Sequence, residues 1–288
     1  MPRVSVVIPT YNNADFLVET MDSVLAQTYA DVEIVVADHS STDRTWDLLQ
    51  PYGSDARVRL LRTPAGGGAE RNWNRVTEEA SGELVKLVCG DDLLYPGLLE
   101  RQVAAFDATP MTGAQVAMVA TTRDIVDATG RPVVRNAGLA GLRGRVPGRV
   151  ALRRSVLVGA NIFGEPCCVL LRRSVLSEIG GWHGNPGFMI DQATYARALL
   201  HGDLVAIAGP LAAFRLSAGQ QSVGMATQQA GSAAEMHRQL AAMTPGLLSA
   251  TDVRIGNAMA ALRAAQRRLV YLWVGKRMRP ASAGPSEE

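Results

Sequence analysis

Short β-rich runs alternate with helical patterns through the first third of the chain, and this alternation constrains the fold more than any other feature. The β-rich runs are residues 3–9, 32–38, 57–62 and 83–89. The helical patterns are an apolar face within residues 16–25, a segment starting at the capping-like SSTD, and residues 69–80. Strands separated by helices pair in parallel through right-handed crossovers. The sequence therefore predicts an α/β fold with a mostly parallel central sheet and flanking helices.

From about residue 115 the pattern changes to that of a mixed α+β lobe. A strand is followed by an irregular stretch rich in Gly and Arg at residues 130–149, then by further helices and strands. Two helical segments close the chain from about residue 226, and the polar end SAGPSEE is typical of disorder. We expect four parts, with the first two forming one domain over residues 1–223: 1–112, 113–223, a helical extension over 224–280, and a disordered tail over 281–288.

Charge, hydropathy and cysteine content exclude several functional classes. The net charge is only +2, from 29 basic and 27 acidic residues, which argues against nucleic-acid binding and for a small or polar substrate. No stretch approaches the ~20 apolar residues that span a bilayer, so we expect a cytoplasmic protein. The three cysteines, Cys89, Cys167 and Cys168, lack the spacing of a metal or disulfide set. We predict that all three are small buried residues.

Polar residues stand at the ends of three predicted strands. They are Pro9, Thr10 and Tyr11 after the first strand, Asp38 at the end of the second, and the pair Asp91 and Asp92 after the fourth. Ligands of open parallel sheets bind beyond the carboxyl ends of the strands. These loops are therefore expected to face one cleft.

The adjacent carboxylates Asp91 and Asp92 have two interpretations. Aspartate is common in turns that follow strands. Two carboxylates held together also repel each other unless a cation lies between them, and Mg²⁺ or Mn²⁺ would relieve that repulsion. Their position at the end of a strand favours the metal site.

Two further features of the N-terminal half could contact a nucleotide. Asp38 could cap the next helix, but the following Ser and Thr residues can do this, which leaves Asp38 free to accept a base N–H. Three glycines precede the helix that carries Arg71, where backbone N–H groups could approach a phosphate. Arg71 is either a diphosphate partner or a solvated surface residue.

Six segments together resemble the family 2 inverting glycosyltransferases, in order and approximate spacing, over about residues 3 to 223. They are VSVVIPTYNN, VVADHSSTDRT, AERNWNRVTEEASGELVKLVCGDD, LLRRSVLSEIGGW, DQATYARALLHG and FRLSAGQQS. The resemblance implies a GT-A fold, with a Rossmann-like sheet and a C-terminal helical extension. It also implies metal-assisted transfer of a hexosyl or deoxyhexosyl group from a UDP-, dTDP- or GDP-linked donor. The acceptor would be a sugar, a lipid-linked molecule or a small molecule, in polysaccharide, glycolipid or natural-product synthesis.

The resemblance also assigns roles to individual residues. Pro9, Thr10 and Tyr11 match the loop around the nucleoside, Asp38 the base contact, and Arg71 the basic residue near the diphosphate. Asp91 and Asp92 match the metal-binding end of the family's DxD motif, and Asp191 matches the general base. Asn161 and Glu165 match positions that often line the sugar or acceptor pocket, and Trp182 could stack on a sugar face.

Three departures from the family pattern leave alternatives open. Cys89 replaces the first carboxylate of the metal motif, Ile190 replaces an acidic residue before Asp191, and Ser217 stands where a histidine ligand is often found. These losses would also suit a non-catalytic protein that binds nucleotide sugars. Asp191 could instead be a helix N-cap, and Trp182 a core residue.

The C-terminal helical pattern is amphipathic. Its apolar positions are Ile255, Met259, Leu262, Leu269 and Trp273, and the basic ones are Arg263, Arg267, Arg268, Lys276, Arg277 and Arg279. This pattern predicts a helix that packs on the main domain or on a second subunit. The alternative is peripheral contact with an anionic membrane, on its cytoplasmic face.

Overall fold

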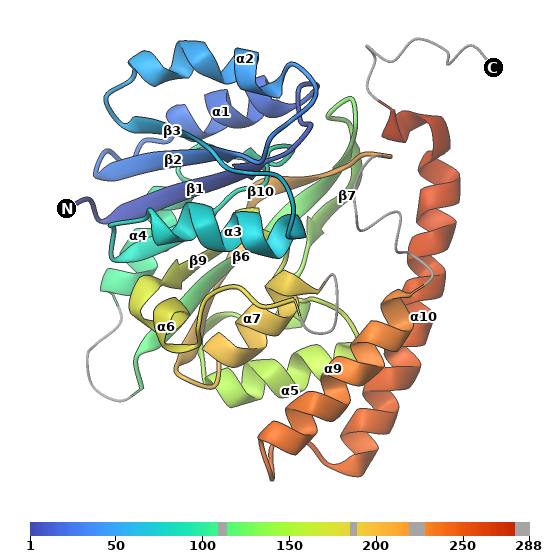
Figure 1. Cartoon of the computed structure of the whole chain (residues 1–288). Coiled ribbons are helices and arrows are strands. Elements are labelled where there is room, and N and C mark those ends of the chain that lie inside the picture. The colour runs from blue at the N-terminus through green and yellow to red at the C-terminus, as the bar shows by residue number, and fades with distance from the viewer. Residues whose placement is uncertain (109–113, 185–188, 219–227, 280–288) are drawn as a thin grey trace.

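The computed structural model describes residues 1–108, 114–184, 189–218 and 228–279. Within them one sheet runs in the strand order β3-β2-β1-β4-β9-β6-β10-β5 and curls between layers of helices (Figure 1). The strands on this path are β1 (Val4–Thr10), β2 (Val32–Asp38), β3 (Val58–Arg62), β4 (Leu84–Leu87), β5 (Leu93–Leu94), β6 (Val116–Asp127), β9 (Val169–Arg172) and β10 (Asp203–Leu216). The predicted tail at 281–288 lies outside the described residues.

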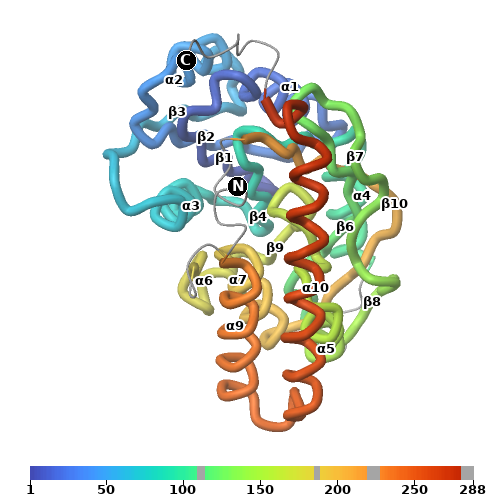
Figure 2. Tube along the Cα trace, turned by 90° about the vertical axis from the view of Figure 1, so that its right-hand side faces the viewer, coloured from blue at the N-terminus to red at the C-terminus, as the bar shows by residue number. Residues whose placement is uncertain are grey.

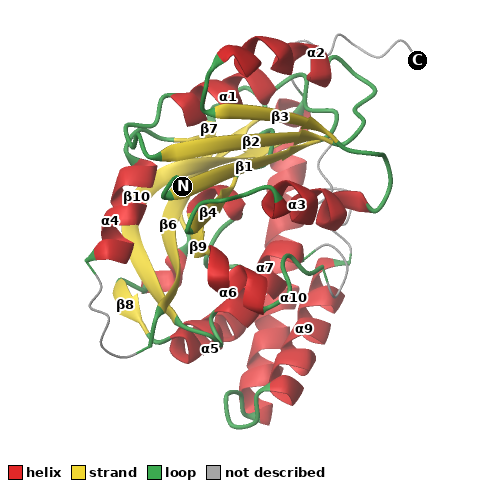
Figure 3. Cartoon of the chain, turned by 60° about the vertical axis from the view of Figure 1, so that its left-hand side comes forward, coloured by secondary structure: helices red, strands yellow, loops and turns green. Residues whose placement is uncertain are grey.

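Helices flank the sheet and complete the chain. Figure 3 shows α1 and α2 above the strands β1 to β3, and α3 on the opposite side. The helices are α1 (Leu17–Leu25), α2 (Thr45–Leu49), α3 (Gly68–Glu78), α4 (Leu98–Asp107), α5 (Gly148–Val158), α6 (Arg173–Glu178), α7 (Ile190–Ala198), α9 (Gln229–Met243) and α10 (Ala250–Val274). Short 3-10 helices add η1 (Gln50–Ser54), η2 (Leu139–Gly141), η3 (Pro166–Cys168) and η4 (Gly275–Met278).

The N-terminal half of the sheet is parallel, as the alternating pattern predicts. Strand β1 lies between β2 and β4, and every one of its residues is buried. Strands covered on both faces need continuous apolar runs, and VSVVIPT is such a run. In this register Thr10 lies beside Asp38, so the polar ends of β1 and β2 emerge together.

Two short strands join the C-terminal half of the sheet to the first half: β9 beside β4, and β5, which pairs antiparallel with β10. β9 pairs antiparallel with both β4 and β6, and β6 pairs in parallel with β10. The prediction of an irregular stretch at residues 130–149 is wrong in part. This stretch forms β7 (Pro132–Ala137) and β8 (Gly144–Val146), which pair antiparallel with β6 and β10. Both strands keep most of their side chains exposed, so their sequence lacks an apolar alternation.

The last two helices pack against the main domain. Figure 2 shows α10 extending from α5 toward β7, with α9 beside it. The approach to α5 is close: a Cβ built on Gly159 would lie 2.3 Å from the backbone nitrogen of Ala260. At the other end, Arg277 Nε donates to Asp127 Oδ2 at 2.6 Å. The prediction that this segment packs on the main domain is therefore confirmed.

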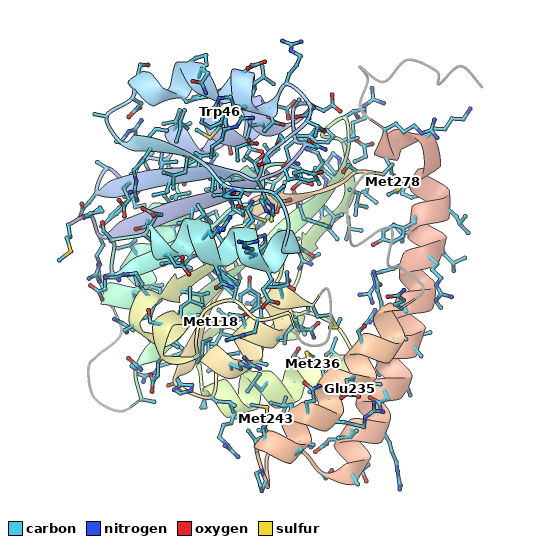
Figure 4. The ribbon with its side chains drawn as sticks, viewed as in Figure 1. Trp46, Met118, Glu235, Met236, Met243 and Met278 are labelled. Carbon is cyan, nitrogen blue, oxygen red and sulfur yellow. The ribbon has the colours of Figure 1, made fainter. Side chains whose placement is uncertain are left out.

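The two C-terminal helices bury the side chains that face the domain and expose others to solvent. Met236 of α9 points toward the domain in Figure 4 and packs with Met189, Ala233 and Ala260. Met243, at the end of α9, is 58% exposed. Within the described residues, no helix combines the length and apolar character that crossing a bilayer requires.

Candidate functional site

A cleft of about 1470 Å³ opens at the carboxyl ends of β1 and β4. Its walls come from both halves of the sheet and from the C-terminal helices. Residues lining it include Thr10, Tyr11, His39, Trp73, Asp91, Asn161, Glu165, Asp191, Ser217, Arg263 and Arg267. The strand-end loops thus face one cleft, as expected from the parallel sheet.

The loop after β1 forms one end of the cleft. Pro9, Thr10 and Tyr11 all line it, and the Tyr11 side chain is 54% exposed. Asn13 folds the loop, because its Oδ1 accepts from Thr10 Oγ1 at 2.9 Å and from the Tyr11 backbone N–H at 3.0 Å. The His39 ring lies edge-on to Tyr11 at a centroid distance of 6.1 Å. The sequence analysis did not identify His39, although it directly follows Asp38.

Asp38 is fully buried and does not itself line the cleft, although the next residue, His39, does. Its Oδ2 accepts from the Ser41 backbone N–H at 3.3 Å and lies 3.6 Å from Arg62 Nε. Its Oδ1 has no hydrogen-bond partner among the described residues. A buried carboxylate oxygen without a donor is costly, so this position favours a ligand that brings an N–H.

Asp91 and Asp92 follow β4 at the centre of the cleft and are held by Arg215. The Arg215 Nε donates to the Asp91 carbonyl oxygen at 3.0 Å, and its backbone N–H donates to Asp92 Oδ1 at 3.2 Å. A Cβ on Gly90 would lie 2.7 Å from Asn13 Oδ1, so glycine lets this turn pack against the loop after β1. Burial, followed by the charges of Asp91 and Glu165, raises the pKa of Asp92 well above its usual value.

The donor atoms around Asp91 suit a cation that is shared with a substrate. Among the described residues, no three or more His, Cys, Asp or Glu side chains gather as a metal site. Mg²⁺ is commonly held by one or two carboxylates together with substrate phosphates, and keeps several waters. Asp91 and Asp92 fit that arrangement, with the Ser217 side chain in the same cleft.

The cysteine prediction is wrong for one of the three residues. Cys167 and Cys168 are buried, but Cys89 is only partly buried and lines the cleft. Cys89 lies beyond the last residue of β4, just before the turn that carries Asp91. Its side chain is therefore no longer covered by the layers that bury the strand.

Asp191 lies in the first turn of α7, partly exposed to the cleft. Asn161 Nδ2 donates to its Oδ2 at 2.7 Å, and the Gln192 backbone N–H also bonds to the carboxylate. The N-cap of this helix is Met189, so the structure does not support Asp191 as the cap. Burial is the main cause that raises the pKa of Asp191 to about 7, and the Glu165 charge adds to it.

Glu165 is already paired within the cleft. Its Oε2 lies 2.5 Å from Arg123 Nε, and its Oε1 accepts from Arg123 Nη2 at 3.0 Å. Asn161 is fixed as well, since its Nδ2 donates to the Gly164 carbonyl and its Oδ1 accepts from the Phe163 N–H. The sequence analysis did not identify Arg123, whose place beside Glu165 depends on the pairing of β6 with β7 and β9.

Besides Asp38, two more predicted site residues, Trp182 and Arg71, do not line the cleft. Trp182 is 1% exposed, and its Nε1 donates to Thr77 Oγ1 at 2.9 Å, so its role in stacking on a sugar gives way to the core alternative. Trp73 packs edge-on against Trp182 at 5.2 Å and lines the cleft in its place. Arg71 is exposed on α3 and its Nη1 donates to the Gly66 carbonyl at 3.4 Å. Gly66 lines the cleft, but Arg71 does not.

Comparison with known families settles which group the sequence falls into. Residues 5–180 match the family model described as glycosyl transferase family 2. The chain belongs to this family. An uncharacterised protein of Mycobacterium tuberculosis is 31% identical over 235 residues, which cover 79% of this chain and 72% of the relative.

Other relatives match over shorter segments. The glycosyltransferase GlyG of Streptococcus pneumoniae is 35% identical over 38% of each chain. Chondroitin synthase of Pasteurella multocida is 36% identical over 35% of this chain and 10% of its own length. The chain therefore matches well under half the length of these two relatives.

Solved structures confirm the GT-A fold. A fragment of Staphylococcus aureus TarS in complex with UDP-GlcNAc matches 95% of this chain and 76% of its own, with a TM-score of 0.69 and 19% identity. The mannosyltransferase PcManGT of Pyrobaculum calidifontis, in complex with GDP-Man and Mn²⁺, matches 96% of this chain and 76% of its own, with a TM-score of 0.63 and 18% identity.

Proposed function

We propose that this protein transfers a sugar from a nucleoside diphosphate donor to an acceptor hydroxyl with inversion at the sugar carbon. The observation that carries the proposal is the placement of Asp191 in the same cleft as Asp91, with a pKa raised to about 7. A general base works best when its pKa lies near the operating pH. Family membership supports the reaction class, and polysaccharide synthesis is the setting suggested by relatives such as chondroitin synthase.

In this mechanism the chain's own residues orient the donor and take the acceptor proton. Asp191 accepts the proton of the acceptor hydroxyl as that oxygen attacks the sugar carbon in line with the departing diphosphate. Asn161 holds the carboxylate in position through its 2.7 Å hydrogen bond. Asp91 and Asp92 would hold Mn²⁺ or Mg²⁺, which would stabilise the negative charge that develops on the leaving diphosphate.

The donor's nucleoside is placed in the pocket after β1. The unpartnered Oδ1 of Asp38 is suited to accept a ring N–H of a base, and the exposed ring of Tyr11 offers a surface beside it. UDP-, dTDP- and GDP-linked sugars all carry such a ring N–H. Arg71 remains a proposed contact of the diphosphate. Because it lies outside the cleft, the glycine loop before it would have to move for Arg71 to reach the diphosphate.

A thermal-shift screen tests the proposal. Nucleoside diphosphates and their sugars are added with and without Mn²⁺, and a ligand at ~100 times its dissociation constant should stabilise the protein by ~2.7 kcal/mol. The alternative, a non-catalytic binding protein suggested by Cys89 and Ser217, predicts the same stabilisation without turnover. If no nucleotide stabilises the protein under either condition, the proposed function is wrong.

Replacing Asn161 with Ala should shift the pH dependence of transfer. Asp191 must be deprotonated to accept a proton, so kcat/KM of the parent should rise with pH through about 7 and then level off. The hydrogen bond from Asn161 lowers the pKa of Asp191, so its loss should raise that pKa and move the midpoint to higher pH. An unshifted midpoint in a folded Asn161→Ala protein, with Asn257→Ala as control, would contradict this role.

We also propose that the outer face of α10 rests on an anionic membrane. Ile255, Leu262, Leu269, Leu272 and Trp273 are each at least 45% exposed along this helix. Exposed basic residues, including Arg268 and Lys276, lie on the same segment. This charge complements acidic lipid head groups, at ~1 kcal/mol for each basic residue near the surface. Lipid-linked acceptors would be reached from such a position.

Replacing Leu269 and Leu272 together with Gln should weaken binding to vesicles that contain phosphatidylserine, because it removes exposed apolar surface without touching the cleft. Cosedimentation measures the effect, with Val18→Gln on α1 as an exposed control and neutral phosphatidylcholine vesicles as a second. If the parent ignores anionic vesicles at low salt and instead forms a dimer that the double variant loses, the occupant is a second copy of the chain.

A further inference from the structure

Two arginines on the inner side of α10 line the cleft. Arg263 and Arg267 are four residues apart, so their side chains leave the same face of the helix about 6 Å apart along its axis. Both side chains are partly buried. Like charges at this spacing destabilise a helix, and the effect grows where water is excluded.

Within the part of the chain that the structure describes, neither guanidinium group has an anionic partner of its own. Arg263 Nη1 donates to the neutral amide of Gln266 at 3.0 Å, and the Nε atoms of Arg263 and Arg267 are both buried without a hydrogen-bond partner among the described residues. Glu165 acts on Arg267 only at longer range, and it is paired with Arg123. Burial lowers the pKa of Arg267 below its usual value, which reflects the uncompensated charge.

The two arginines lie on the side of the cleft where the acceptor is proposed to bind. The contact between Gly159 and Ala260 sets α10 against the end of α5, one turn before Arg263. The chain leaving α5 leads directly to Asn161, which hydrogen-bonds to Asp191. The nucleoside pocket of Tyr11 and Asp38 is formed by different elements, at the ends of β1 and β2.

We propose that Arg263 and Arg267 form a binding subsite for a phosphate or diphosphate group carried by the acceptor. Guanidinium groups bind phosphate oxygens through paired, charge-assisted hydrogen bonds, and two of them match a group with two negative charges better than a single carboxylate. Such an acceptor is either a lipid-linked diphosphate or a soluble phosphorylated sugar. The inference rests on the proposed function, because only a transferase has an acceptor.

Calorimetric titration with inorganic pyrophosphate in EDTA tests the subsite directly. The parent should bind pyrophosphate, and the double variant R263Q/R267Q should bind it at least ~10-fold more weakly, since each charge-assisted contact is lost. R263K/R267K should retain part of the affinity because it keeps the charge. Arg254→Gln changes an exposed arginine of the same helix outside the cleft and should bind like the parent. A second titration with geranyl diphosphate then distinguishes the two kinds of acceptor. Tighter binding than that of pyrophosphate indicates a lipid-linked acceptor, and equal binding indicates a soluble one.

Binding of nucleoside diphosphate with Mn²⁺ is measured on the same proteins and tests the donor site separately. If the parent does not bind the nucleotide, the proposed function fails, whereas the pyrophosphate titration still reports on the two arginines. The subsite proposal is overturned if the parent binds no pyrophosphate, or if R263Q/R267Q binds it as the parent does. It is also overturned if the double variant loses nucleotide and pyrophosphate affinity equally, because the arginines would then contact the donor's diphosphate.

Discussion

Replacing Asp191 with Asn should lower the rate of sugar transfer by roughly 10²- to 10⁴-fold, or ~3 to 5 kcal/mol of barrier. Asn keeps the size of the side chain and an oxygen that can accept the Gln192 N–H, but it cannot take a proton from the acceptor. Donor affinity and melting temperature should therefore stay near those of the parent. Initial rates of transfer, measured beside a nucleotide titration, separate these two effects.

The matched control is Glu100→Gln, which neutralises a carboxylate in the first turn of α4, outside the cleft. It should transfer at the parental rate. Near-parental transfer by the Asp191→Asn protein would remove Asp191 as the base. Glu165 would then be the next carboxylate to test, although its ion pair with Arg123 makes it less available to accept a proton.

Replacing Asp91 with Ala should abolish the part of nucleoside diphosphate affinity that depends on Mn²⁺. Asp91 lines the cleft, and the turn that carries it is held by the buried Arg215, which donates to the backbone carbonyl of Asp91. The substitution thus removes a proposed ligand without removing the contact that shapes the turn. Isothermal titration with and without Mn²⁺ measures the difference.

Asp47→Ala serves as the control for charge alone, because Asp47 is exposed on α2 and does not line the cleft. It should keep the full response to Mn²⁺. A folded Asp91→Ala protein whose nucleotide affinity still rises with Mn²⁺ as in the parent would exclude Asp91 as a metal ligand.

The sequence predicts the elements whose burial follows a simple pattern. The apolar runs of β1 and β2 could be recognised because both faces of a central parallel strand are covered. β7 and β8 could not, because most of their side chains are exposed; β7 pairs with β6 directly before it, and β8 pairs with the distant β10. For Trp182, the sequence left a choice between core and cleft that only its contact with Thr77 decides.

For the site, too, residues with a local sequence signal could be predicted, and residues that depend on tertiary packing could not. Asp38 and Asp91 could be proposed because each stands at the end of a strand, and Asp191 because it matches the general base of the family that the sequence resembles. The contribution of α10 could not. Its amphipathic pattern predicts that the apolar face packs on the main domain, but Leu262 and Leu269 of that face are exposed, and Ala260 on the opposite face packs on α5. Arg263 and Arg267 read as ordinary surface cations in the sequence, and only the packing of Ala260 against Gly159 brings them to the cleft.

Donor cleavage by the full chain tests the central claim most directly. The protein is incubated with Mn²⁺ and UDP-, dTDP- or GDP-linked sugars, with water taking the place of the acceptor hydroxyl, and release of the nucleoside diphosphate and free sugar is followed. The proposed mechanism predicts that one donor class is cleaved, and that the Asp191→Asn protein cleaves it at least ~100-fold more slowly. A nucleotide sugar that stabilises the protein but is never cleaved would contradict the mechanism and identify a binding protein in place of a transferase.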